Sequence, residues 1–171
     1  MRIRRLKPSE VRFSCDFINS KFDSGVKIGD VLDNVIWGGY TYIKRFPMLN
    51  VVRKNGQYYT KDNQQLWIYK VAESVGVFND VLVKYHPPHS RFAQSVGEIS
   101  TESDGVCIRI KGNPHGIVWR KSIPYLEERW MCFNRYNVKF MECVIVNNKT
   151  SPRSPRTPRK RKLMTASSTR S

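Results

Sequence analysis

The sequence predicts an α+β domain, built from a small mixed sheet with two or three packed helices, and a disordered basic C-terminal tail. Apolar stretches with strand-like alternation are interspersed with stretches of helical spacing. Asn55-Gly56 is typical of a two-residue hairpin turn. From residue 147 onward Ser, Thr, Pro and basic residues dominate, and such a segment buries too little apolar surface to offset its ordering entropy. We therefore expect a domain at 1–85, an extension of that domain at 86–146 and the tail at 147–171.

The elements of the first half follow from local patterns. A short strand with Val11 and Phe13 on one face is expected after a Pro turn, and the spacing of Phe17, Ile18 and Phe22 predicts a short helix that ends at Gly25. A stripe of apolar residues from Ile28 to Ile36 predicts an amphipathic helix that stops at Gly38-Gly39.

The hairpin should join strands at 49–52 and 58–60. Asp62 is a suitable N-cap for a helix over 63–74, and VLVKY predicts the next strand. In the second half, 106–110 alternates like a strand, 123–134 could form a helix, and VKFMECVIV resembles a last strand.

The charge balance points to polyanionic partners. The chain carries 30 Lys and Arg against 14 Asp and Glu, a formal charge of +16. Residues 149–171 hold eight of the basic residues and no acidic one, so the remaining 22 basic and 14 acidic residues leave +8 on the rest of the chain. A field of this sign favours nucleic acid, anionic membrane or acidic protein surfaces.

Several classes of protein are disfavoured. No apolar run approaches the roughly 20 residues of a membrane span, and the charged N-terminus lacks a secretory apolar region, so we expect no membrane partner. The cysteines form no C-x-x-C pair, which predicts free thiols in a reducing compartment. His86 and His89 flank two prolines that direct their rings apart, so no metal is expected. No phosphate-binding glycine motif or catalytic grouping predicts a cofactor.

The tail contains two short signals. A dense basic cluster follows Pro158 and suits the acidic grooves of a nuclear-import receptor, which predicts a nuclear location; the cluster consists of Arg159, Lys160, Arg161 and Lys162. The alternative is a solubilising or RNA-binding tail. Ser151, Ser154 and Thr157 each precede proline and are candidate sites for proline-directed kinases, whose phosphate could mask the cluster.

Basic and aromatic residues interleave between positions 40 and 61. Such a pattern provides aromatic stacking and cationic tracking for single-stranded nucleic acid, and the candidate residues are Lys44, Arg45, Arg53, Lys54, Tyr58 and Lys61. The alternative is that the aromatic residues belong to the core.

One region carries a resemblance to a known family. The phrases LKPSEVRF, PMLNVV and GQYYTKDNQQLW, with the helix at 28–39 between the first two, are similar to an uncharacterised eukaryotic branch of the ParB/sulfiredoxin-like superfamily. The resemblance covers roughly residues 6–85 and implies that superfamily's fold. It also implies a ligand or phosphate loop at the helix start, formed by Lys61, Asp62, Asn63, Gln64 and Gln65.

The loop departs from the family motifs. The G-E-R-R of ParB proteins, which grips nucleotide phosphates, corresponds to Asp62 to Gln65, so both arginines are replaced by glutamine and charge-assisted clamping is lost. The catalytic cysteine of the sulfiredoxin G-C-H-R motif corresponds to Asn63, so that chemistry is expected to be absent. A capping Asp62 would also place its carboxylate on the amides that a phosphate would use.

These observations favour a non-enzymatic basic nuclear protein that binds nucleic acid or chromatin through a cationic face and the tail. One alternative is a nucleotide-binding switch, or an enzyme of phosphoryl-transfer or nuclease type, acting at Lys61 to Gln65. Another alternative is a protein-binding scaffold with a degenerate fold. The oligomeric state does not follow from the sequence.

Overall fold

A computed structural model describes residues 2–96, 99 and 101–122 of the chain. Three expected elements lie outside the described residues: the helix at 123–134, the last strand and the tail at 147–171. The extension expected at 86–146 is described as far as residue 122, with gaps at 97–98 and 100. Within the described part the chain is an α+β protein with a mixed sheet, which confirms the predicted class.

The main sheet has five strands in the order β1-β6-β4-β5-β2. Their bounds are β1 (Arg2–Leu6), β2 (Val11–Phe13), β4 (Leu49–Lys54), β5 (Gln57–Thr60) and β6 (Val81–His86). The pairs β1–β6 and β4–β5 are antiparallel, whereas β4–β6 and β2–β5 are parallel. A second, two-stranded sheet pairs β3 (Phe17–Asn19) with β7 (Arg109–Lys111) in parallel.

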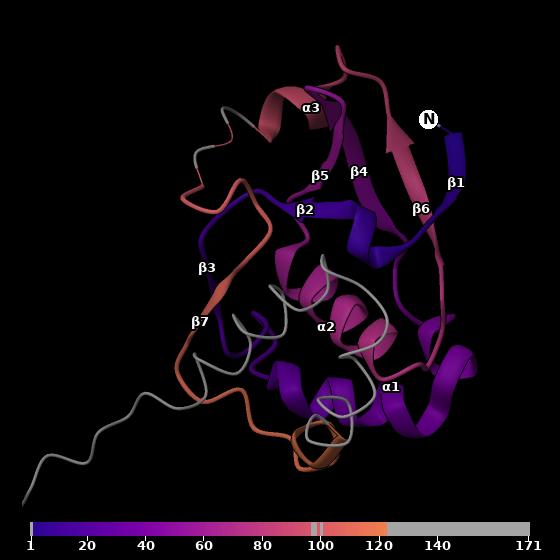
Figure 1. The fold of residues 1–171 in the computed structure, drawn as a ribbon, viewed down its shortest axis with the longest axis vertical. Coiled ribbons are helices and arrows are strands. Elements are labelled where there is room, and N and C mark those ends of the chain that lie inside the picture. The colour runs from indigo at the N-terminus through magenta and orange to yellow at the C-terminus, as the bar shows by residue number, and fades with distance from the viewer. Residues whose placement is uncertain (1, 97–98, 100, 123–171) are drawn as a thin grey trace, which may run out of the picture.

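The helices are arranged in layers against the main sheet. Helix α2 (Asn63–Ser74) lies between the sheet and α1 (Ile28–Ile43), as Figure 1 shows. Ten of the twelve residues of α2 are buried, because the helix is covered on both sides. Trp67 of α2 meets the ring of Trp119 edge-on, with 5.4 Å between their centroids. The short helices are the 3-10 turn η1 (Pro8–Glu10) and α3 (Arg91–Ser95).

The register of the strands decides which side chains share a face. Leu49 is opposite Val83 across β4 and β6, and both are buried against α2. Alternation along the strands therefore turns Val52 and Tyr59 to the other face, where the short α3 covers them through Ala93. The hairpin turn is as predicted: Asn55 and Gly56 both have positive φ, of 48° and 80°, the combination that a two-residue hairpin turn requires.

One expectation for the first half needs correction and another needs an addition. The short helix predicted near Phe17 is wrong, because Phe17–Asn19 forms β3 and its backbone pairs with β7. The helix that begins at Ile28 is interrupted at Gly39, as expected, because φ 52° and ψ −144° at that residue are not helical. A further helical stretch after the break, which was not expected, extends α1 to Ile43.

The strand predicted at 106–110 lies slightly further along, at Arg109–Lys111. Strand β1 was not predicted. Among the cysteines, Cys15 carries a free thiol, whereas Cys107 is disulfide-bonded, so the expectation of free thiols is wrong for Cys107. Among the described residues, no helix combines the length and the apolar character that a membrane span needs.

Candidate functional sites: a polar pocket and an arginine–tyrosine face

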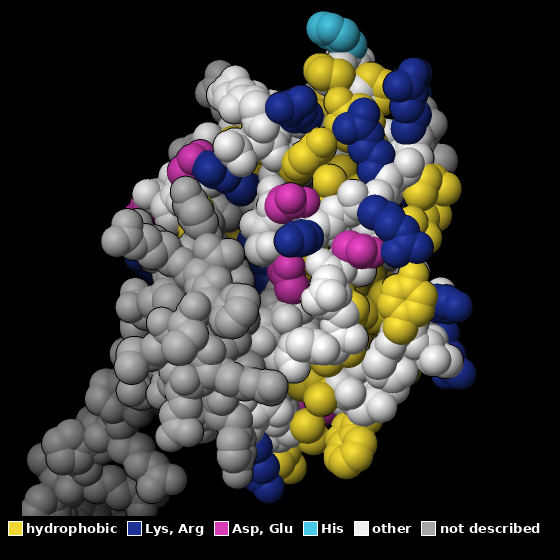
Figure 2. Space-filling view, turned by 45° about the vertical axis from the view of Figure 1, so that its right-hand side comes forward, with side chains coloured by type: hydrophobic (Ala, Val, Ile, Leu, Met, Phe, Trp, Pro, Cys, Tyr) yellow, Lys and Arg dark blue, Asp and Glu magenta, His cyan; other side chains and the backbone are white. Residues whose placement is uncertain are grey.

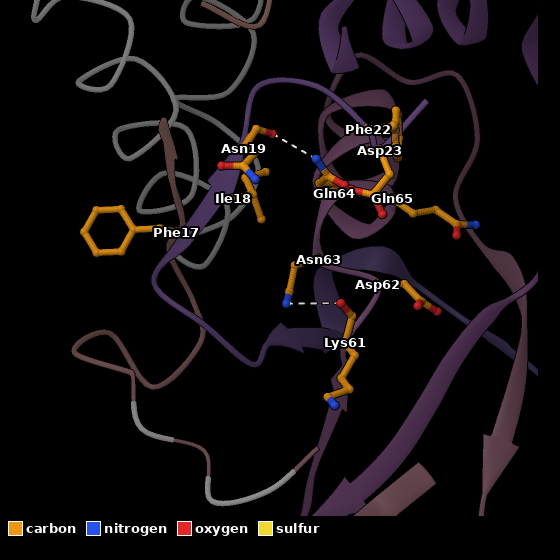
Figure 3. Close-up of a pocket in the computed structure, with 10 residues that line it drawn as sticks. All are labelled: Phe17, Ile18, Asn19, Phe22, Asp23, Lys61, Asp62, Asn63, Gln64 and Gln65. Atoms are coloured by element: carbon orange, nitrogen blue, oxygen red, sulfur yellow. Dashed lines mark hydrogen bonds between the residues drawn. The ribbon is translucent and has the colours of Figure 1, made fainter. Parts of the chain in front are cut away.

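A pocket of about 400 Å³ lies at the start of α2. All five residues of the loop predicted from the sequence line it, as shown in Figure 3. The opposite wall comes from β3 and the turn after it, and consists of Phe17, Ile18, Asn19, Phe22 and Asp23. The long-range pairing of β3 with β7 therefore helps to position one wall of the pocket, and local sequence patterns do not reveal that pairing.

Asn63 ties the start of α2 to the connection between β2 and β3. Its Oδ1 accepts from the Ser14 N–H at 2.9 Å, and its Nδ2 donates to Ser14 Oγ and to Cys15 Sγ, both at 3.1 Å. The side chain is only 8% exposed. A buried amide with these partners holds two chain segments in register, so the primary role of Asn63 here is structural.

Asp62 occupies the N-cap position, as predicted, but its carboxylate does not cap the helix. Its Oδ2 accepts from the backbone N–H of Asn50 at 2.9 Å and from Asn50 Nδ2 at 3.1 Å. Within the described part of the chain, no side-chain cap is found at this helix start. The expectation that the carboxylate would cover the first-turn amides is therefore wrong, because the start of β4 draws it away.

Gln64 and Gln65 hold neighbouring loops. Gln64 Nε2 donates to the carbonyls of Asn19 and Lys21, at 3.0 and 2.7 Å, and Gln65 Nε2 donates to the Pro47 carbonyl and to Tyr69 Oη. Burial raises the pKa of Tyr69 to about 12. The Nε2 groups of both glutamines thus donate hydrogen bonds to acceptors within the protein.

The charges that line the pocket do not favour an anion strongly. Lys61 is the cation among the lining residues, and its side chain points away from Gln64 and Gln65 in Figure 3. Asp23 and Asp62 supply two carboxylates to the same lining. At the Phe17 side, Lys111 Nζ and Arg109 Cζ lie 4.9 and 5.4 Å from the ring centroid, which adds positive charge outside the pocket.

A second group of side chains lies on the α2 side of the sheet, beyond the region that α2 covers. The guanidinium of Arg4 is 4.3 Å from the ring centroid of Tyr85, and Arg4 Nη1 donates to Tyr58 Oη at 3.3 Å. The rings of Tyr58 and Tyr85 meet edge-to-face with centroids 6.3 Å apart. Arg53 is opposite Tyr58 in register, 5.9 Å from its ring. We call Arg4, Arg53, Tyr58 and Tyr85 the arginine–tyrosine face.

The electrostatic surroundings of this face are positive. None of the five strands of the main sheet, as the structure bounds them, contains Asp or Glu. Figure 2 shows Lys and Arg side chains interleaved with hydrophobic ones over the upper part of the molecule, where these strands lie. The face therefore combines exposed guanidinium groups with partly exposed tyrosine rings.

The structure divides the residues predicted to contact nucleic acid. Arg53 and Tyr58 meet on the arginine–tyrosine face, and Lys54 follows Arg53 at the hairpin. Lys61 lines the pocket. Lys44 and Arg45 follow α1, at the end of the molecule away from the hairpin (Figure 1).

Arg4 and Tyr85 were missed by sequence reasoning, although period-two alternation in a strand over RIRRL would place Arg2 and Arg4 on one face.

Comparison of the chain with protein-family models, with curated proteins and with solved structures found no match. Among the described residues, no group of three or more His, Cys, Asp or Glu side chains is placed to hold a metal ion. The class that the structure defines is thus a basic α+β domain with a mixed five-stranded sheet.

Proposed function

We propose that this protein is a non-enzymatic, basic nuclear protein that binds nucleic acid or chromatin through the arginine–tyrosine face and the basic tail. The observation that carries the proposal is the stacking of the Arg4 guanidinium on Tyr85, 4.3 Å from the ring centroid, on a sheet whose strands hold no acidic residue.

The chemistry of the face fits an unpaired or accessible nucleic-acid strand. Guanidinium groups pair with phosphate oxygens through parallel hydrogen bonds, and tyrosine rings stack on bases of any sequence. Arg4 and Arg53 both lie against tyrosine rings, so phosphate contacts and stacking surfaces occur side by side. An acidic protein surface would pair with the guanidinium groups but would offer fewer flat groups to stack on the tyrosine rings.

The tail supports the nuclear part of the proposal by its sequence alone. The cluster Arg159, Lys160, Arg161 and Lys162 suits a nuclear-import receptor, and the Ser-Pro and Thr-Pro sites at Ser151, Ser154 and Thr157 would allow phosphate to weaken that contact. These residues lie outside those the structure describes.

We also propose that the domain has a ParB/sulfiredoxin-like fold. The order of a hairpin, a polar loop and a buried helix, β4-β5-α2, supports this assignment, as do the sequence phrases that carry the resemblance. The replaced motif residues support a function without the family's phosphate clamp.

The direct test is binding of the full-length chain to fluorescent single-stranded DNA and RNA near physiological salt. We expect the double substitution Arg4→Gln with Arg53→Gln to weaken binding by roughly tenfold, because two phosphate contacts are removed. The matched control is Arg5→Gln with Lys84→Gln, which removes equal charge from the other face of β1 and β6. Equal weakening by both pairs would contradict a role for this face, and no binding by the unmodified chain would overturn the proposal.

A second candidate is a nucleotide-binding switch, or a phosphoryl-transfer enzyme, at the pocket. It is favoured by the convergence of all five loop residues on one pocket and by the Asp62 carboxylate turning away from the helix start. Thermal unfolding with a nucleotide panel tests it, since a ligand present at 100 times its Kd adds about 2.7 kcal/mol of stability. The leading proposal predicts no shift. A shift that Asn63→Ala abolishes would favour the pocket.

A further inference from the structure

The most exposed large hydrophobic side chain of the described residues is a tryptophan. Trp37 on α1 is 79% exposed, whereas Trp67 and Trp119 are fully buried. A surface indole contributes little to the core, and single exposed apolar residues are common on proteins. The residues around Trp37 distinguish it from such an isolated case.

Trp37 is followed directly in the sequence by two glycines, which have no side chains. Gly38 and Gly39 come next, and the helix kinks at Gly39, where φ is 52°. An added Cβ at Gly38 would lie 2.7 Å from Tyr42 Cβ, so a larger residue cannot be placed there without a shift. The backbone geometry thus requires glycines beside Trp37, and no side chain of the next two residues crowds the indole.

The charges on α1 are segregated along the helix. Asp30 and Asp33 lie near its start, and their carboxylates accept hydrogen bonds from the backbone N–H groups of Gly116, Ile117 and Trp119. From residue 34 to residue 46 the chain contains no acidic residue and two basic ones, Lys44 and Arg45. Lys44 Nζ lies 5.3 Å from the ring centroid of Tyr40, which is itself exposed.

We propose that Trp37 is a stacking platform for an unpaired base of single-stranded nucleic acid, with Lys44 and Arg45 contacting the adjacent phosphates. An exposed indole on a helix that contains no acidic residue after Asp33, and that is followed by two cations, complements a polyanion that carries flat rings. Asp33 lies one turn before Trp37, and its carboxylate accepts hydrogen bonds from the backbone N–H groups of Ile117 and Trp119. A base within a duplex is already stacked on both sides and offers no free face. The proposal rests on nucleic-acid binding as the function and adds a second contact, on α1, away from the arginine–tyrosine face (Figure 1).

The experiment measures binding of full-length variants to oligo-dT, to oligo-U and to a DNA duplex, together with tryptophan fluorescence. We expect Trp37→Leu to weaken single-strand binding by on the order of tenfold, to leave duplex binding unchanged and to remove fluorescence quenching by oligo-dT. Trp37→Phe keeps a stacking ring and should retain most of the affinity. Ile117→Ala, which trims another exposed apolar side chain, is the matched control and should behave like the unmodified chain.

The outcomes separate this inference from the function on which it rests. Unchanged single-strand affinity in Trp37→Leu, while Arg4→Gln with Arg53→Gln still weakens binding, would overturn the role of Trp37 and leave the proposed function standing. An equal loss in Trp37→Leu and Trp37→Phe would overturn stacking as the mechanism. Absence of binding to every probe by the unmodified chain would overturn both. Because the side chain is exposed, thermal unfolding of each variant should match the unmodified chain and exclude misfolding.

Discussion

The polar side chains at the start of α2 form hydrogen bonds that join neighbouring segments of the chain. Asn63 bridges to Ser14 and Cys15, and the two glutamines that follow bind backbone carbonyls of neighbouring loops. An arginine at position 65 would bring a charge to a place where the Gln65 amide now donates to the partly buried Pro47 carbonyl and to the buried Tyr69 hydroxyl. Positions 64 and 65 therefore have a structural use in this protein.

Lys70 of α2 is a charged residue in a buried position. It is 7% exposed, and burial lowers its pKa from 10.5 to about 8, with Glu73 opposing this shift and Arg12 adding to it. Its ammonium lies 5.4 Å from the ring centroid of Phe13 and 3.4 Å from the Ser9 carbonyl oxygen. The folded protein therefore releases the Lys70 proton more readily than the unfolded chain does.

This shift predicts a pH-dependent stability. Between pH 8 and pH 10 the unfolded chain retains a proton that the folded chain has lost, so the free energy of unfolding should rise with pH. The shift corresponds to at most about 3 kcal/mol. Above pH 10 the raised pKa of Tyr69 acts in the opposite direction, because the folded chain then holds the extra proton. Urea unfolding across this range measures the effect.

Lys70→Met is the control that assigns the effect to this residue. The rise between pH 8 and pH 10 should largely disappear in the variant, since the neutral side chain has no proton to release. An equally steep rise in Lys70→Met would show that the general decrease in positive charge, and not Lys70, is responsible.

At the scale of elements, prediction succeeded where local chemistry determines the structure. The Asn55-Gly56 hairpin was expected from turn chemistry, and it exists. Helix α2 also begins after Asp62 as expected, although the capping hydrogen bond on which that expectation rested is not formed. Lys61 to Gln65 line one pocket, and their role as a ligand or phosphate loop, which the family resemblance implies, stays a prediction. The direction of the Asp62 carboxylate was not predictable, because its partner Asn50 comes from another strand.

Prediction failed where pairing is non-local. The spacing of Phe17, Ile18 and Phe22 predicts a helix, but Phe17–Asn19 forms strand β3 because β7 supplies hydrogen bonds that the local pattern does not reveal. The arginine-rich sequence of β1 indicates only a charged terminus, but the segment forms a strand because it pairs with β6. Arg4 and Tyr85 meet only through this register, which is why the arginine–tyrosine face could not be identified from the sequence.

At the scale of the whole molecule, positive charge is present both on the folded domain and in the tail. On the acid-free sheet Arg4 and Arg53 lie next to tyrosine rings, and Lys44, directly after α1, lies next to Tyr40. The segment 149–171 adds eight basic residues. The central question is whether the domain itself contacts phosphates or whether the tail accounts for all binding.

The salt dependence of binding answers it most directly. We would measure the affinity of the full-length chain for oligo-dT across a salt series, with all eight basic residues of 149–171 replaced by glutamine. Each lost phosphate contact reduces the slope of log K against log salt by about 0.7. We expect the tail variant to keep a clearly negative slope, which falls by about 1.4 more when Arg4→Gln and Arg53→Gln are added. Salt-independent or abolished binding in the tail variant would contradict a nucleic-acid interface on the domain.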